Sequence, residues 1–124
     1  MLSYFTEDEF KCKCSNGKDG GSCGMDVAGE LKEVVVRARH LAQIPFIINS
    51  GARCEAHNKA VGGTEGSAHT KGLAVDIKAE NSLDRAIIHN ALCRVGILRF
   101  GMYSNFIHAD IDLTKPTPRI WLGK

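Results

Sequence analysis

One short stretch decides the fold of this chain: Ser67-Ala68-His69-Thr70-Lys71-Gly72-Leu73-Ala74-Val75-Asp76. Its apolar second half predicts a strand over residues 73–77, and the glycine-bearing first half predicts a loop that enters this strand. A second strand is predicted over residues 106–111, which include Phe106-Ile107-His108-Ala109-Asp110. Alternate side chains along a strand share a face, so His108 and Asp110 should point the same way. Asp76 and His108 could then come from adjacent strands.

The polar side chains of these two segments form a plausible metal set. Asp76 follows His69 by seven residues, with Gly72 between them to let the backbone turn. His108 supplies a second imidazole. Catalytic zinc sites commonly use three nitrogen or oxygen ligands and keep a fourth position for water. The pattern therefore predicts one zinc at His69, Asp76 and His108, although a lone histidine is more often an ordinary surface or core residue.

The rest of the chain predicts an α+β fold. Apolar residues at three- and four-residue steps predict one helix capped by Asp26 and running to about Gln43, and a second helix over residues 82–95. Thr6 is expected to cap a short helical turn over residues 6–10. The remaining predicted elements are a turn of helix at 56–61 and short strands at 46–49, 98–103 and 119–122. Together these elements indicate a small, mainly antiparallel sheet packed with two principal helices.

Bulk properties favour a single domain over residues 1–124. A chain of 124 residues has room for one hydrophobic core, and a net charge of +2 gives no strong electrostatic attraction to nucleic acid. No run reaches the length of a membrane span. The first ten residues lack the basic start and apolar core of a secretory signal, so we expect cytoplasmic synthesis without a signal peptide. We also expect a monomer.

Five cysteines are many for a chain of this size. Cys12, Cys14 and Cys23 lie in a glycine-rich loop over residues 11–25, whereas Cys54 and Cys93 are distant in sequence. The odd number and the lack of a signal argue against a complete disulfide framework. The first three, with Cys54, could hold a structural zinc; free thiols, or one disulfide formed after release, are the alternatives. Cys93 falls in an apolar helical pattern and is predicted to be buried.

Further residues extend the central pattern into a family resemblance. They are Ser50-Gly51-Ala52-Arg53, Asn58 and Val61-Gly62-Gly63. With the Ser-x-His-x-x-Gly-x-Ala-x-Asp block and the late Phe-Ile-His-x-Asp, they resemble the zinc D-alanyl-D-alanine carboxypeptidase family of bacterial and phage peptidoglycan peptidases. That family shares its fold with the Hedgehog signalling domain. The resemblance covers about residues 4–112 and is strongest to the short, phage-type members.

The resemblance implies a function and assigns roles to residues. It implies a zinc metallopeptidase that cuts peptidoglycan stem peptides next to a D-amino acid, as a lysin-like carboxypeptidase or endopeptidase acting on the cell wall after release. It also implies that Arg53 binds substrate and stabilises the oxyanion, and a planar guanidinium suits both tasks. A surface salt bridge is the alternative for Arg53. Ser67, Asn58 and Tyr103 are further candidate substrate-binding residues, although Ser67 could simply cap the loop.

The general base is where this sequence departs from the family. Many members carry a glutamate three residues before the last zinc histidine, but here that residue is Asn105, which cannot take up a proton. Asp110 is our predicted base, with Tyr103 or His57 as possible assistants. Alternatively, Asp110 orients His108 through its distal N–H. Asn105 also supports a rival function, a catalytically inactive zinc-fold module that binds cell-wall peptides. A second rival is a structural zinc protein organised by the cysteines.

Overall fold

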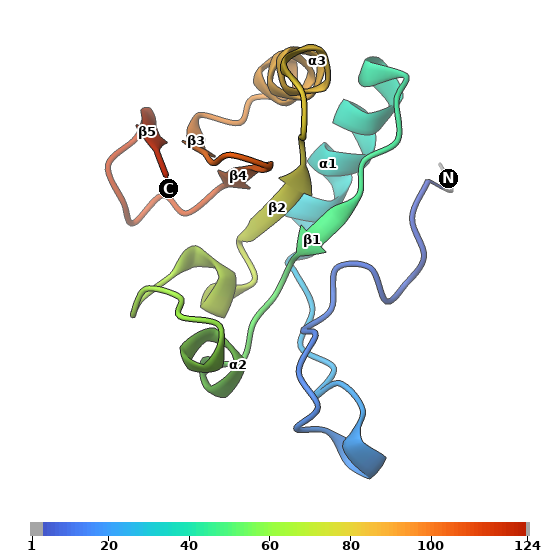
Figure 1. Cartoon of the computed structure of the whole chain (residues 1–124), viewed down its shortest axis with the longest axis vertical. Coiled ribbons are helices and arrows are strands. Elements are labelled where there is room, and N and C mark those ends of the chain that lie inside the picture. Colours follow the sequence, from blue (N-terminus) through green and yellow to red (C-terminus); the bar gives the residue numbers. More distant parts are fainter. Residues whose placement is uncertain (1–3, 124) are drawn as a thin grey trace.

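The computed structural model describes residues 4–123 and contains one five-stranded sheet with helices (Figure 1). The helices are α1 (Gly29–Ala42), α2 (Glu55–Ala60) and α3 (Ser82–Arg94), with 3-10 turns η1 (Lys18–Gly20) and η2 (Ala68–Lys71). The strands are β1 (Ile48–Ser50), β2 (Ala74–Lys78), β3 (Arg99–Met102), β4 (Phe106–Asp110) and β5 (Arg119–Leu122). Their order in the sheet is β1-β2-β4-β3-β5, and only the β3–β5 pair is parallel. The predicted α+β fold with a mainly antiparallel sheet is confirmed.

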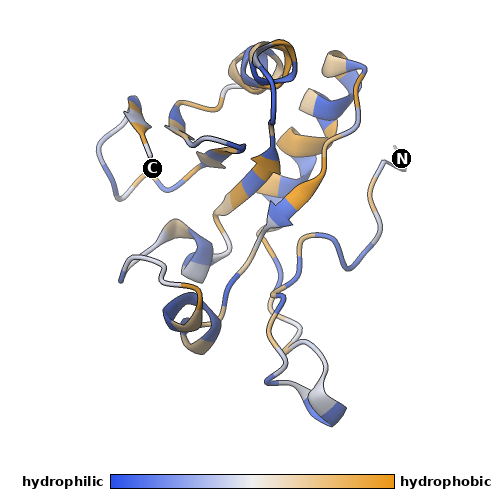
Figure 2. Ribbon diagram, in the orientation of Figure 1, coloured by the Kyte–Doolittle hydropathy of each residue, from blue (hydrophilic) through white to orange (hydrophobic). Residues whose placement is uncertain are grey.

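One face of the sheet packs against α1 and α3 and forms the core. Val75 and Ile77 of β2, with Ile107 and Ala109 of β4, belong to the same buried cluster as helix residues Leu31, Val35, Ile88 and Leu92. Figure 2 shows the hydrophobic colour concentrated on the central strands and on α1. Neighbouring side chains of a strand point to opposite faces. The intervening residues of β2 and β4 therefore lie on the face away from the two long helices, which is where the site is built.

The start of α1 differs from the sequence prediction. Asp26 does not cap the helix: its Oδ1 accepts a hydrogen bond from Val27 N at 2.8 Å and its Oδ2 pairs with Lys32. The N-cap position is Ala28, whose N–H donates to Gly72 O at 2.8 Å. The loop before β2 thus anchors the first turn of α1, a contact between distant segments that no local capping rule contains.

The other helices follow local signals more closely. Asn81 caps α3 by accepting a hydrogen bond from Asp84 N at 2.8 Å, and Gly96, with a φ of 94°, follows the helix end. The short turn predicted over residues 6–10 is present as hydrogen-bonded turns over residues 7–10, which do not extend into a regular helix. Among residues 4–123, no helix is both long enough and apolar enough to cross a membrane.

The predicted burial of Cys93 is wrong. Ile88, Ala91 and Leu92 form the buried stripe of α3, and the residue after Leu92 falls outside it. Cys93 is exposed, with its Sγ 3.5 Å from His89 Nε2. The apolar pattern of this helix identified Ala91 and Leu92 as buried, but it also placed Leu83 on the buried face, and Leu83 is exposed.

Candidate metal centre and cleft

The register of the sheet places two predicted ligands side by side. Asp76 of β2 is directly opposite His108 of β4, so the prediction that they lie on adjacent strands is confirmed. The same row continues to Gly101 of β3 and Trp121 of β5. Gly101 is required there, because a Cβ on it would lie 2.6 Å from Trp121 Nε1. The indole can therefore lie over β3, with its ring centroid 5.3 Å from that of His108.

His69 reaches this row from the turn η2. Ser67 Oγ caps the turn by accepting from His69 N at 3.2 Å, as its alternative reading anticipated. Gly72 ends the turn with a φ of 71° in the left-handed region, where glycine carries no Cβ penalty. A side chain on Gly72 would also lie 2.9 Å from Asp26 O. The chain then enters β2 with His69 above Asp76.

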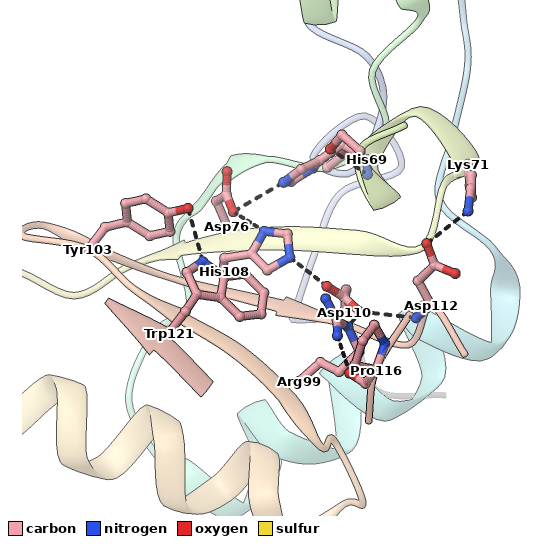
Figure 3. Close-up of polar contacts among 12 residues, drawn as sticks. His69, Lys71, Asp76, Arg99, Tyr103, His108, Asp110, Asp112, Pro116 and Trp121 are labelled. Atoms are coloured by element: carbon pink, nitrogen blue, oxygen red, sulfur yellow. Dashed lines mark hydrogen bonds and ion pairs between the residues drawn. The ribbon is translucent and has the colours of Figure 1, made fainter. Parts of the chain in front are cut away.

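Three donor atoms converge on this face (Figure 3). Asp76 Oδ1 lies 3.2 Å from His69 Nε2 and 3.1 Å from His108 Nδ1. The opposite nitrogens are occupied: His69 Nδ1 lies 2.7 Å from Gly51 O, and His108 Nε2 lies 2.7 Å from Asp110 Oδ2. Carbonyl and carboxylate oxygens only accept hydrogen bonds, so those two nitrogens carry the ring hydrogens. The remaining nitrogen of each neutral imidazole therefore aims a lone pair at Asp76.

Such a convergence suits a metal cation. The ligand atoms of His69, Asp76 and His108 all lie within 4.8 Å of one another. Two nitrogen lone pairs and a carboxylate oxygen repel one another unless a proton or a cation lies between them. Two imidazoles with one carboxylate form a donor set typical of zinc. The residues present therefore fit the metal that the sequence pattern predicted.

The electrostatics of the cluster agree with this. Burial disfavours the charge on Asp76, but when the histidine nitrogens that face it are protonated, hydrogen bonds from His108 and His69 outweigh burial and hold the pKa of Asp76 well below its usual range. Burial likewise disfavours a charged His108, yet its hydrogen bonds with Asp110 and Asp76 raise its pKa. A site that holds a proton so firmly is one where a cation can replace that proton.

An open cleft of about 460 Å³ lies over the cluster. Its lining includes seven of the residues proposed from sequence: Arg53, Ser67, His69, Asp76, Tyr103, His108 and Asp110. Asp110 lies at its floor and is almost fully buried. The cleft lining does not include Asn58, Asn105 or His57. A three-ligand cluster at the bottom of an open cleft has the layout of a catalytic metal site rather than a closed structural one.

Comparison with protein families agrees with this geometry. A family model described as Peptidase M15 matches residues 3–110. The chain belongs to the peptidase M15 family. Members of this family are zinc-dependent metallopeptidases, so the chain is a zinc metallopeptidase whose substrate is a peptide. No curated protein matches the chain at a significant level.

Arg53 of this M15 peptidase is held from three sides. Its Nη2 donates to Asp76 Oδ2 at 3.1 Å, its Nε to Ser50 Oγ at 3.0 Å and its Nη1 to Asn58 Oδ1 at 3.0 Å. The buried Asn58 also donates from Nδ2 to Thr64 O at 3.0 Å. Asn58 thus acts from behind the cleft wall: it holds Arg53 and the loop that follows α2.

Arg99 and Trp121 are among the cleft residues of the M15 peptidase that the sequence analysis did not propose. Arg99 is buried on β3, where its Nε donates to Asp110 Oδ1 at 2.7 Å and its Nη1 donates to Pro116 O. Its guanidinium carbon lies 5.2 Å from the Trp121 ring centroid. An arginine inside an apolar strand pattern is a signal that could have identified Arg99. Nothing local identifies Trp121, because its place depends on the parallel pairing of β5.

Asp110 has little room for a second partner. Its Oδ2 accepts from His108, and its Oδ1 accepts from both Arg99 and Asp112 N, the latter at 3.1 Å. Burial raises the pKa of a carboxyl group, but the hydrogen bond from His108 and that from the Asp112 backbone outweigh it and lower the pKa of Asp110. The geometry is that of a carboxylate that orients a ligand histidine.

A second cluster of potential ligands lies outside the cleft. The thiol sulfurs of Cys12, Cys14, Cys23 and Cys54 lie within 4.8 Å of one another. All four, like Cys93, are free cysteines in the structure. The grouping anticipated from sequence is therefore present in space, and none of the four lines the cleft.

Proposed function

We propose that this M15 peptidase hydrolyses peptidoglycan stem peptides at a bond next to a D-amino acid, using one zinc held by His69, Asp76 and His108. The observation that carries the proposal is the convergence of their three donor atoms, with the opposite ring nitrogens occupied, at the bottom of an open cleft. The choice of polymer and of a D-residue is supported by the resemblance of the central sequence block to peptidoglycan peptidases.

Zinc supplies Lewis acidity: it polarises a scissile carbonyl and makes a water molecule nucleophilic near neutral pH. The protein's part is to hold the three ligands in fixed tautomers and orientations. Gly51 O does this for His69, and Asp110 does it for His108. Arg53 does it for Asp76 by binding the carboxylate oxygen that faces away from the histidines.

Arg53 is suited to bind the substrate as well. A guanidinium has five N–H donors, and three of these are occupied by Asp76, Ser50 and Asn58. The two that remain belong to a side chain that lines the cleft. They can donate to a terminal carboxylate of the peptide or to the oxyanion that develops on the attacked carbonyl.

Tyr103 and Ser67, which both line the cleft, are proposed to contact the substrate. The Tyr103 ring stacks on Phe106 with centroids 4.4 Å apart, and its hydroxyl oxygen accepts from Trp121 Nε1 at 3.2 Å. This arrangement leaves the hydroxyl hydrogen available to a substrate oxygen. Ser67 Oγ accepts from His69 N and likewise retains its own hydrogen for donation.

Asp110 is proposed first as the residue that positions His108. Both of its oxygens already accept hydrogen bonds, and its side chain is only 1% exposed. Its role as the general base stays a prediction, as does assistance from Tyr103. Of the described residues that line the cleft, only Asp76 and Asp110 carry carboxylates.

The test is digestion of purified peptidoglycan and of synthetic stem peptides by the zinc-loaded protein. Paired peptides that differ only in a D- or L-alanine at the terminus report the stereochemical preference, and mass analysis identifies the bond that is cut. We expect cleavage next to the D-residue, loss of cleavage with a chelator, and recovery on adding zinc. Cleavage of both peptides at equal rates would contradict the D-specificity.

Zinc binding without any cleavage would instead support the inactive peptide-binding module, which Asn105 favours. Asn105 is exposed in the turn between β3 and β4 and does not line the cleft. A phage-type lysin that reaches the wall only after release, and that acts as a monomer, stays a prediction. A zinc at the four cysteines is a separate proposal, because no step of peptide hydrolysis requires it.

A further inference from the structure

The loop over residues 11–25 buries too little apolar surface for packing alone to hold it in one conformation. It extends away from the sheet, and the short turn η1 forms its far tip (Figure 1, blue, at the bottom). Only Cys12 is buried within it, and Figure 2 shows this part of the chain mostly in white and blue. The hydrogen bond from Cys12 N to Met25 O at 2.8 Å joins the two ends of the loop. A segment with so little buried apolar surface usually needs a cross-link or a metal to hold one conformation.

The four sulfurs have the spacing of a tetrahedral metal site. In such a site, Zn–S bonds of about 2.3 Å place the sulfurs roughly 3.8 Å apart. The four Sγ atoms all lie within 4.8 Å of one another. Cys12 and Cys14 flank one residue of the loop, Cys23 returns from its far end, and Cys54 comes from the N-terminal end of α2.

Backbone N–H groups surround these sulfurs as they surround metal thiolates. Cys54 N donates to Cys12 Sγ at 3.2 Å, and Cys23 N donates to Cys14 Sγ at 3.3 Å. His57 N donates to Cys54 Sγ at 3.4 Å, which also caps α2. N–H donors stabilise negative charge on sulfur, and such contacts accompany the ligands of metal sites. A neutral thiol would gain much less from them.

We propose that Cys12, Cys14, Cys23 and Cys54 bind one zinc ion in a closed, structural site that is separate from the hydrolytic centre. Four thiolates leave no position for water, and a tetrahedral S₄ set is typical of zinc. The basic residues Lys11, Lys13 and Lys18 of the same loop offset the charge that four thiolates leave on a divalent ion.

The site would also support the wall of the cleft. Cys54 follows Arg53 directly and caps α2, and α2 carries Asn58, which hydrogen-bonds both Arg53 and Thr64. Zinc at the cysteines would therefore join the loop over residues 11–25 to the segment that fixes Arg53. Loss of this metal should loosen Arg53 without removing any ligand of the hydrolytic zinc.

The experiment replaces zinc with Co²⁺ in the full-length protein purified under reducing conditions. Thiolate-to-cobalt charge transfer gives a strong near-ultraviolet band that imidazole and carboxylate ligands do not produce. We expect the band in the wild type and in His69→Ala, and we expect it to disappear in Cys14→Ser and Cys23→Ser. Cys93→Ser is the matched control, because it removes an exposed thiol elsewhere, and it should retain the band. Zinc content should fall by one equivalent per chain in each of the two loop variants and should not change in Cys93→Ser.

Hydrogen exchange covers the case in which a variant folds poorly. Amides of residues 11–25 should exchange at least about tenfold faster in Cys23→Ser, while those of β2 and β4 keep their protection. A wild type without the thiolate band, or with disulfides among these cysteines in freshly reduced protein, would overturn the proposal. Iron in place of zinc in the purified protein, visible by its colour, would overturn the identity of the metal.

Discussion

The two clusters of potential ligands in this chain are placed by different means. His69, Asp76 and His108 stand on paired strands and on a turn capped at both ends, so the sheet places them whether or not a metal is bound. The four cysteines stand mostly on an irregular loop whose only buried residue is one of the ligands. If both proposals hold, the first site is prepared in advance for its metal, whereas the second would need the metal to complete its own framework.

This difference matches what each site can do. A hydrolytic site requires fixed ligands and an open position, and here the ligands are three and the cleft is open. A structural site requires only that the metal be enclosed, and four thiolates enclose it. The two roles are therefore distinguished less by the number of candidate ligands than by how rigidly the fold holds those ligands before a metal binds.

The largest expected effect comes from removing one ligand of the site formed by His69, Asp76 and His108, here called the sheet-borne site, while leaving the cysteine cluster intact. His69→Ala should lower kcat/KM by on the order of 10³-fold or more, because the Lewis acid is lost with its ligand. Zinc content should fall by one equivalent while circular dichroism and the thiolate band of the Co²⁺ protein persist. His40→Ala, an exposed histidine on α1, is the control and should behave like wild type. Cleavage retained in His69→Ala would exclude this ligand set.

Arg53 lies where the two regions meet, and Arg53→Lys tests that junction. Lysine keeps the charge but lacks the planar fork that binds Asp76, Ser50 and Asn58 together. We expect kcat/KM to fall by about 10²-fold, the size of effect seen when an oxyanion donor is removed. Steady-state kinetics on a stem peptide measure it, with the exposed Arg37→Lys as control. A change of less than about threefold would favour the surface salt-bridge alternative for Arg53.

Asp110→Asn sharpens the claim that the sheet-borne site is ordered in advance. If Asp110 orients His108, zinc affinity should fall by about 10- to 100-fold, and excess zinc should restore activity. If Asp110 is the general base, kcat should stay low at saturating zinc while the affinity is unchanged. Zinc titration and kinetics on the same preparation separate the two outcomes. The second would contradict the positioning role proposed above.

The smallest expected effect concerns the buried carboxylate Asp112, which ties η2 to the end of β4. It accepts from Lys71 Nζ at 3.0 Å and from Thr114 N and Oγ1. Burial opposes its charge, but hydrogen bonds from Thr114 and Lys71 outweigh it and lower its pKa to about 2 from an ordinary 3.8. Because the folded-state pKa is the lower one, its contribution is present above about pH 4 and is lost as the pH falls toward 2.

Urea unfolding of the metal-free protein measures this contribution. The free energy of unfolding of wild type should fall more steeply between about pH 5 and pH 2.5 than that of Asp112→Asn, by on the order of 1–2 kcal/mol. Metal-free protein is used in both cases because acid releases metal ligands. Parallel pH profiles for the two proteins would show that Asp112 stabilises the loop only as a neutral hydrogen-bond partner.

Much of the fold was predictable because its signals are local. Apolar periodicity identified both long helices and all five strands to within a few residues, and Gly96 marked the end of α3. Two predictions failed at places where a distant contact decides the outcome. Gly72, rather than Asp26, sets the start of α1, and the rotation of α3 against the sheet leaves Cys93 exposed.

For the site, the sequence by itself determined the candidate ligands and their spacing, the arginine near them, and the proposed grouping of four cysteines, because these residues recur in recognisable motifs. Only the tertiary structure decided which atoms meet. The register between β2 and β4 brings Asp76 beside His108, and Gly51 O and Asp110 fix the two histidine tautomers. Arg99 and Trp121 entered the cleft through the pairing of β3 with its neighbours. Long-range pairing depends on the whole chain, and no short motif contains it.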